Sequence, residues 1–119
     1  MSWIRLGILG ALLATAGCSS EHWVRFDVKS AAPLGAVIDS NKIELPAGIA
    51  VGVEAIPVAD GRLLEHTKLE MIPSSSGIVG IDDGVSAHAF VLYGIAPGQV
   101  TVELYVANEY VGALPARVF

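Results

Sequence analysis

The side chains that could carry chemistry in this sequence are three histidines, one cysteine and a few acidic clusters. His22, His66 and His88 are too far apart in the sequence to share one face of a helix or strand, so they predict no local metal-binding pair. The sequence also has no recognisable order of nucleophile, base and acid. We therefore expect no catalytic residues and no enzyme activity.

Acidic residues could instead supply oxygen ligands for calcium. The best pair is Asp82 and Asp83, and weaker candidates are Asp60 and the triplet Asp39-Ser40-Asn41. The spacing of an EF-hand is absent, and each cluster stands where a turn favours Asp or Asn. The turn interpretation is therefore preferred, and no cofactor is expected. Calcium at Asp82 and Asp83 is kept as the weaker alternative.

Two aromatic residues, Trp23 and Tyr105, fall on the expected solvent side of alternating segments. Exposed aromatic residues can form a binding patch for a protein or a glycan, which Tyr93 and Tyr110 could extend. Alternatively, aromatic residues on the solvent face of a sheet pack across neighbouring strands and stabilise it. The sequence leaves both interpretations open.

The single cysteine, Cys18, follows an uncharged segment that begins after Arg5 and ends in small residues. Its length is typical of a signal peptide and falls short of the roughly 20 residues that a membrane-spanning helix needs. We expect a signal peptide over residues 1–17, a lipidated N-terminus and first strand over 18–29, and a β-sandwich domain over 30–119.

Ala16-Gly17-Cys18 resembles the lipobox of bacterial lipoproteins, with Thr15 in place of the usual Leu. The resemblance implies a diacylglyceryl thioether on Cys18 and an acylated amine, and two or more acyl chains anchor a protein stably. Ser19, rather than Asp, follows the cysteine, which in such lipoproteins implies transfer to the outer membrane. The alternative is an ordinary secretory signal peptide.

Composition excludes several classes of protein. Without residues 1–17 the chain has 102 residues, with 6 Lys and Arg against 12 Asp and Glu, because Arg5 is the one charged residue removed. The basic residues are scattered singly, which excludes a nucleic-acid surface. One cysteine cannot form an internal disulfide, so the fold must depend on packing.

Alternation of apolar and polar residues predicts an all-β chain after residue 20. Segment 63–72, which could also be read as a helix, is predicted to be a strand. Asp82-Asp83-Gly84 is predicted to end the strand before it, and Asn108-Glu109 is predicted to form a tight turn. Pro115 limits the last strand to a sheet edge or a bulge. About seven or eight strands are expected in an antiparallel sandwich. They cover residues 21–29, 35–38, 49–57, 63–72, 77–81, 87–93, 99–107 and 110–119.

The block from Met71 to Val106 resembles the group 2 bacterial immunoglobulin-like domains. The resemblance implies an Ig-like sandwich that serves as a spacer, adhesion or docking unit without chemistry of its own. It is carried by the serine turn Ser74-Ser75-Ser76, the strand end Ile78-Val79-Gly80-Ile81-Asp82 and the later element Gly94-Ile95-Ala96-Pro97-Gly98-Gln99-Val100-Thr101-Val102. Met71 stands where the family tends to have tryptophan, and Pro73 replaces a serine.

These observations predict a non-enzymatic protein of the bacterial cell envelope, anchored by lipid in the outer membrane and facing the periplasm or the cell surface. Its expected partners are the membrane and an envelope protein, with no nucleic acid and no small-molecule substrate. The alternative is a soluble periplasmic or secreted protein of the same fold that binds a ligand or acts as an inhibitor.

Overall fold

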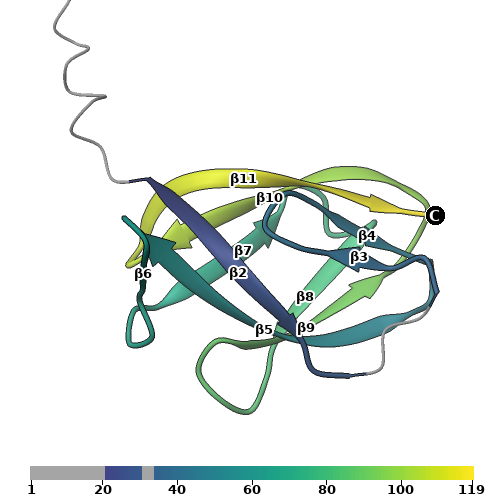
Figure 1. The fold of residues 1–119 in the computed structure, drawn as a ribbon. Coiled ribbons are helices and arrows are strands. Elements are labelled where there is room, and N and C mark those ends of the chain that lie inside the picture. Colours follow the sequence, from purple (N-terminus) through teal and green to yellow (C-terminus); the bar gives the residue numbers. More distant parts are fainter. Residues whose placement is uncertain (1–20, 31–33) are drawn as a thin grey trace, which may run out of the picture.

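The computed structural model describes residues 21–30 and 34–119. The expected signal peptide and Cys18 lie outside these residues. The described chain is all-β (Figure 1), and it contains no helix long and apolar enough to cross a membrane. The strands are β2 (His22–Val28), β3 (Val37–Ile38), β4 (Ile43–Leu45), β5 (Ala50–Ala59), β6 (Arg62–Leu63), β7 (Leu69–Pro73), β8 (Val79–Asp83), β9 (Ala89–Gly94), β10 (Gly98–Val106) and β11 (Glu109–Val118).

The strands form two sheets, which pack in a sandwich-like arrangement. One sheet has the order β3-β4-β11-β10-β7, and the other has the order β2-β5-β9-β8 with β6 paired to β5. The seven strands of five or more residues have the neighbours A-B-E-D and C-F-G of a constant-type immunoglobulin sandwich. The predicted two-sheet β architecture is therefore confirmed.

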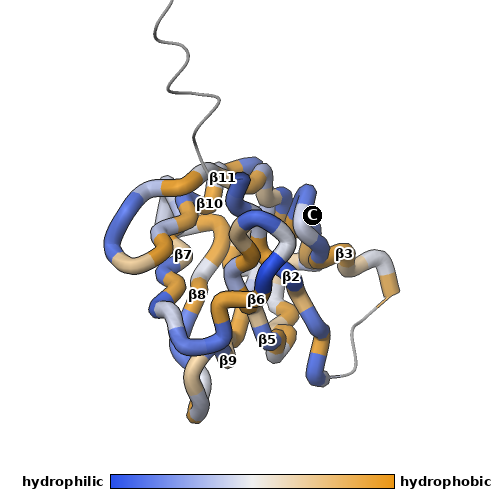
Figure 2. The backbone as a smooth tube through the Cα atoms, turned by 60° about the vertical axis from the view of Figure 1, so that its left-hand side comes forward, coloured by the Kyte–Doolittle hydropathy of each residue, from blue (hydrophilic) through white to orange (hydrophobic). Residues whose placement is uncertain are grey.

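Alternating residues of both sheets meet in one core. In β10, Val102, Leu104 and Val106 are buried while Thr101 is exposed, as the sequence alternation predicted. Along the tube in Figure 2, hydrophobic and hydrophilic segments alternate in the same way. The core follows from the period of two, which turns every second side chain toward the facing sheet.

The strand count and one pairing differ from the prediction. The structure has ten strands, because three short pieces, β3, β4 and β6, also pair. β4 pairs with β11 in parallel, with Ile43 beside Ala116 and Leu45 beside Val118. Ile43 and Leu45 are fully buried. Joining the β11 sheet lets this short strand bury both side chains, so the sandwich is not purely antiparallel.

Two segment boundaries are also corrected. Segment 63–72 is not one strand, because a turn over 64–67 separates β6 from β7, and the amide of Thr67 donates to the Leu64 carbonyl at 3.2 Å. The strand predicted to stop before Asp82 continues through both aspartates and ends at Asp83, because Asp82 and Asp83 pair with Val91 and Phe90 of β9. Pairing with β9 thus outweighs the turn preference of the two aspartates.

The hairpin between β10 and β11 turns one residue earlier than predicted. Val106 pairs with Glu109 and Tyr105 with Tyr110, so the two-residue turn is Ala107-Asn108. Both turn residues have positive φ, 51° and 69°. This is the left-handed turn geometry that matches the twist of a hairpin. Glu109 is therefore the first residue of β11 rather than part of the turn.

Pro115 was expected to confine the last strand to a sheet edge or a bulge, but β11 lies between β10 and β4. The register shift of β11 lies between Tyr110 and Gly112, whereas Pro115 pairs in register with Thr101. Pro115 has no backbone N–H to donate, and the structure still places it where no strand would accept that hydrogen bond. β4 pairs with β11 only from Ala116 onward. The amide of Phe119 donates to the Leu45 carbonyl at 3.0 Å, so alternation directs the nitrogen of Pro115 to the same side, just before β4 begins. The missing N–H thus lies on the β4 side of β11, at a position that β4 does not reach.

Candidate functional site

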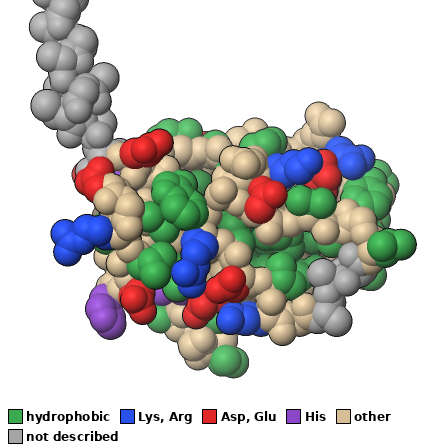
Figure 3. Space-filling model, viewed as in Figure 1, with side chains coloured by type: hydrophobic (Ala, Val, Ile, Leu, Met, Phe, Trp, Pro, Cys, Tyr) green, Lys and Arg blue, Asp and Glu red, His purple; other side chains and the backbone are tan. Residues whose placement is uncertain are grey.

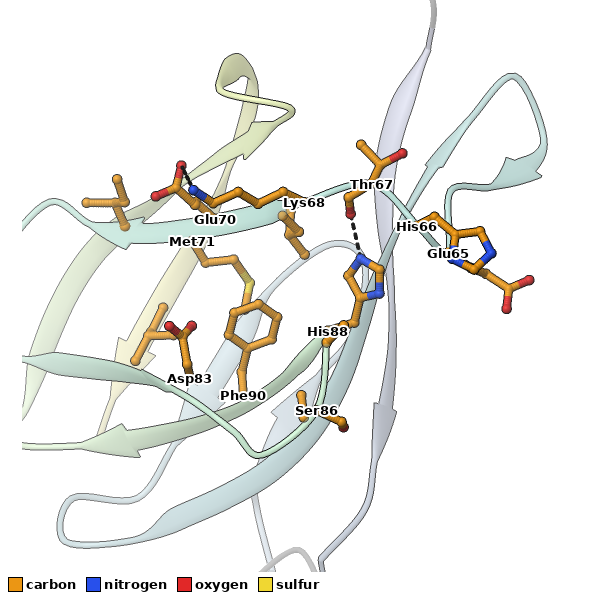
Figure 4. Close-up of a pocket in the computed structure, with 15 residues that line it drawn as sticks. Glu65, His66, Thr67, Lys68, Glu70, Met71, Asp83, Ser86, His88 and Phe90 are labelled. Carbon is orange, nitrogen blue, oxygen red and sulfur yellow. Dashed lines mark hydrogen bonds and ion pairs between the residues drawn. The ribbon is translucent and has the colours of Figure 1, made fainter.

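A groove of about 660 Å³ opens between β7, at the edge of one sheet, and β8, at the edge of the other. Its apolar wall includes Met71 and Phe90, which lie next to each other in Figure 4. Its polar lining includes Lys68, Asp83 and His88. In the described residues no further strand pairs with the outer edge of β7 or of β8. Side chains from both sheets therefore line the groove between these two edge strands.

His88 lies in the turn between β8 and β9 and reaches across the groove to the segment before β7 (Figure 4). Its Nε2 donates a hydrogen bond to the backbone carbonyl of Thr67 at 2.6 Å. The backbone of His88 is left-handed, with φ of 66°, and its carbonyl accepts from the amide of Ala55 at 2.8 Å. His88 therefore connects the segment between β6 and β7 to the sheet of β5, β8 and β9, and its ring has a structural hydrogen bond.

The other two histidines do not join His88 in a catalytic cluster. In Figure 4, His66 and Glu65 project away from His88, although both line the outer part of the groove. His22 begins β2, where it pairs with Ala59 of β5. Among residues 21–30 and 34–119, no group of three His, Cys, Asp or Glu side chains is placed to hold a metal ion.

Asp82 and Asp83 do not converge on one point. As consecutive residues of β8 they point to opposite faces of the strand. Asp83 pairs with the inward-facing Phe90 and lines the groove, whereas Asp82 pairs with Val91. The weak calcium candidate therefore has its two carboxylates on different sides of β8.

The turn interpretation of the Asp39 cluster is confirmed. Asp39 Oδ1 accepts hydrogen bonds from the backbone amides of Asn41 at 2.8 Å and Lys42 at 3.0 Å. This is the turn in which an aspartate bonds the amides that follow it. It fixes the connection between β3 and β4.

Trp23 lies on the outward face of β2, opposite Val58 of β5, and Leu63 of β6 lies on the other side of Val58. Val58 is 2 % exposed, while Trp23 is 41 % exposed. Trp23 and Leu63 thus flank an apolar residue on an outer face, as expected if Trp23 stabilises the sheet. Figure 3 shows basic and acidic side chains beside one another on the face in view. On β2 itself, Arg25 and Asp27 form an ion pair at 3.3 Å.

Tyr105 lies on the outward face of β10, in the other sheet, so Trp23 and Tyr105 do not form one patch. Its hydroxyl donates a hydrogen bond to Glu103 Oε1 at 3.0 Å. Its ring meets that of Tyr110 edge to face, with ring centroids 5.7 Å apart. The structure thus brings Tyr105 together with Tyr110, whereas Tyr93 lies on β9 of the sheet that carries Trp23.

The pKa of Tyr105 is raised above its usual value of 10.0, first by the hydrogen bond to Glu103 and then by desolvation and the negative charge of Glu103. We expect the ultraviolet absorbance of tyrosinate to show one tyrosine that ionises late. Tyr105→Phe should remove this component, and Glu103→Gln should move it to lower pH. A late component that persists in Tyr105→Phe, or that Glu103→Gln leaves unmoved, would contradict the contact.

The same shift predicts how stability depends on pH. The folded state holds the Tyr105 proton more tightly than the unfolded chain does. The linked stabilisation is therefore complete below the unfolded pKa of about 10 and is lost as pH rises through the raised pKa. Glu103→Gln should flatten this alkaline loss in urea unfolding measured at several pH values.

Comparison with known proteins shows the fold and no family. No family model matches the sequence, and no curated protein matches it at a significant level. Among solved structures, the chain is similar to the crystal structure of domains 4 and 5 of the S-layer protein SbsC, with a TM-score of 0.52 and 11 % sequence identity. The similarity covers 79 % of this chain and 53 % of that one, about half of its length.

Proposed function

We propose that the protein is a non-enzymatic structural or interaction module of the bacterial cell envelope, anchored in the outer membrane through lipid on Cys18. The observation that carries the proposal is the similarity of its sandwich to domains of an S-layer protein, which is a bacterial surface protein. The sequence resemblance to group 2 bacterial immunoglobulin-like domains favours the same role. A module of this kind acts through the partner on which it docks.

The arrangement of the polar side chains supports a role without catalysis. His88 bonds a backbone carbonyl, Asp39 caps a turn, and the ion pairs of the described residues lie on the surface. Each of these groups has a structural partner in the folded domain. The proposed role therefore depends on the surfaces of the sandwich and not on a reactive centre.

The anchor is tested by growing cells that produce the full chain with labelled palmitate. We expect label on the protein, no label on Cys18→Ser, and normal label on Ser20→Ala as the matched control. Circular dichroism of each purified variant checks that the sandwich is intact. Absence of label, or label that survives Cys18→Ser, would contradict lipidation. Unlabelled protein in the periplasmic or secreted fraction would favour the soluble alternative.

A further inference from the structure

The outward face of β7, β10 and β11 carries two rows of side chains across three strands. In the first row, Glu70 of β7 and Tyr110 of β11 lie on either side of Tyr105. In the second row, Ile72 lies beside Glu103. We call these five residues the aromatic-acidic face. They come from distant parts of the sequence, and only the strand register places them together.

The aromatic-acidic face exposes large apolar surface. Tyr110 is 59 % exposed and Ile72 is 46 % exposed. Tyr105 and Tyr110 meet at an interplanar angle of 68°, and an edge-to-face pair leaves at least one ring face uncovered. Exposed tyrosines that are held by neighbouring contacts are typical of the centre of protein interfaces.

The negative charge of this face is not fully balanced by basic side chains of the described residues. Among the ion pairs of residues 21–30 and 34–119, none involves Glu103, whose carboxylate accepts only the Tyr105 hydroxyl. Glu70 pairs with Lys68 at 3.8 Å, but both side chains are largely exposed, so the pair is weak. Negative charge therefore remains next to the open tyrosine ring.

We infer that the aromatic-acidic face binds an arginine side chain in an exposed segment of a partner protein. A guanidinium group can stack on a tyrosine ring and bond a carboxylate at the same time. Ile72 offers apolar contact for the aliphatic part of the arginine. A second copy of this chain is a poorer occupant, because the chain carries a net charge of −5. The inference rests on the proposed interaction role and names the chemistry of the partner.

The test uses isotope-labelled full chain in a neutral detergent, titrated with the peptide acetyl-Gly-Arg-Gly-Arg-Gly-amide and followed by amide chemical shifts. We expect the largest shifts around residues 70, 103, 105 and 110. The same peptide with citrulline in place of arginine keeps the shape but not the charge, and it should shift these amides much less. Binding should weaken at least about fivefold in Tyr110→Ala and in Glu103→Gln.

Glu54→Gln is the matched control, because Glu54 is an outward strand carboxylate of the other sheet that pairs with Lys29 at 3.9 Å. It should leave peptide affinity unchanged. Equal shifts around Glu54, equal binding of the citrulline peptide, or unchanged affinity in both variants would overturn the inference. None of these outcomes affects palmitate labelling, so the anchor and the binding face are tested separately.

Discussion

Replacing Gly94 with alanine is expected to lower the free energy of unfolding by about 1–3 kcal/mol, the range found when atoms are forced into a packed interior. A Cβ atom at Gly94 would lie 2.6 Å from the backbone carbonyl oxygen of Pro46 and 3.1 Å from a methyl group of Val118. The Pro46 segment cannot move away freely, because the amide of Gly48 donates to the Gly94 carbonyl at 2.9 Å. Urea unfolding followed by circular dichroism measures the loss.

Gly52→Ala is the control for this variant. Gly52 lies in the same sheet, and the nearest atom to its added Cβ is the Ser30 hydroxyl oxygen at 3.9 Å, which is ordinary contact. Because alanine also restricts the unfolded chain, its stability should be equal to or slightly above that of the wild type. A Gly94→Ala variant as stable as Gly52→Ala would mean that the β4–β5 connection does not pack against the end of β9.

Leu45→Ala should cost about 2–5 kcal/mol, the usual range for truncating a buried leucine. Leu45 is fully buried although its strand, β4, has only three residues. Much of the cost comes from the cavity left between the sheets, because the neighbouring strands can collapse only in part. Since small domains have a total stability of about 5–15 kcal/mol, this single change would remove a large share of it.

Leu34→Ala is a closely matched control, because Leu34 has the same side chain and lies shortly before β3 and β4 in the chain, yet it is 99 % exposed. Its effect should stay within about 0.5 kcal/mol. If Leu45→Ala and Leu34→Ala behave alike in urea unfolding, β4 would be loosely attached to the domain, contrary to its parallel pairing with β11.

The strand pattern could be predicted because each strand exposes one face, and a period of two is visible in the sequence. β10 shows this best, since its inward residues were identified without a structure. The parallel pairing of β4 could not be predicted in this way. It depends on contact between Ile43 and Ala116, which lie far apart in the sequence, and three residues carry too little pattern to indicate a partner.

Only part of the aromatic-acidic face could be predicted from the sequence, because the pairing of β10 with β11 depends on where the chain turns. Alternation placed Tyr105 on the solvent side, but a turn at Asn108-Glu109 would not have put Tyr110 opposite it. The observed turn at Ala107-Asn108 shifts the register so that the two tyrosines pair. Moving the turn by one residue shifts the pairing by two positions, so Tyr110 keeps its outward face but moves from opposite Ala107 to opposite Tyr105. A left-handed conformation is rare for alanine, so a turn that begins at Ala107 could not be predicted from the residue types.

The parallel ladder between β4 and β11 also decides how the domain responds to tension. In Figure 1, β2 begins at one end of the domain and the C-terminus lies at the other. Force applied between the two chain ends acts first on β2, which pairs with β5. Once β2 has detached, the force reaches β4 and β11, which run in the same direction, and it pulls these two strands past each other along their length. Their hydrogen bonds then share the load and must break together, whereas a peeled strand loses its bonds one at a time. A domain held at its N-terminal end and pulled at the other should therefore resist mechanical extension more strongly than its thermodynamic stability alone would suggest.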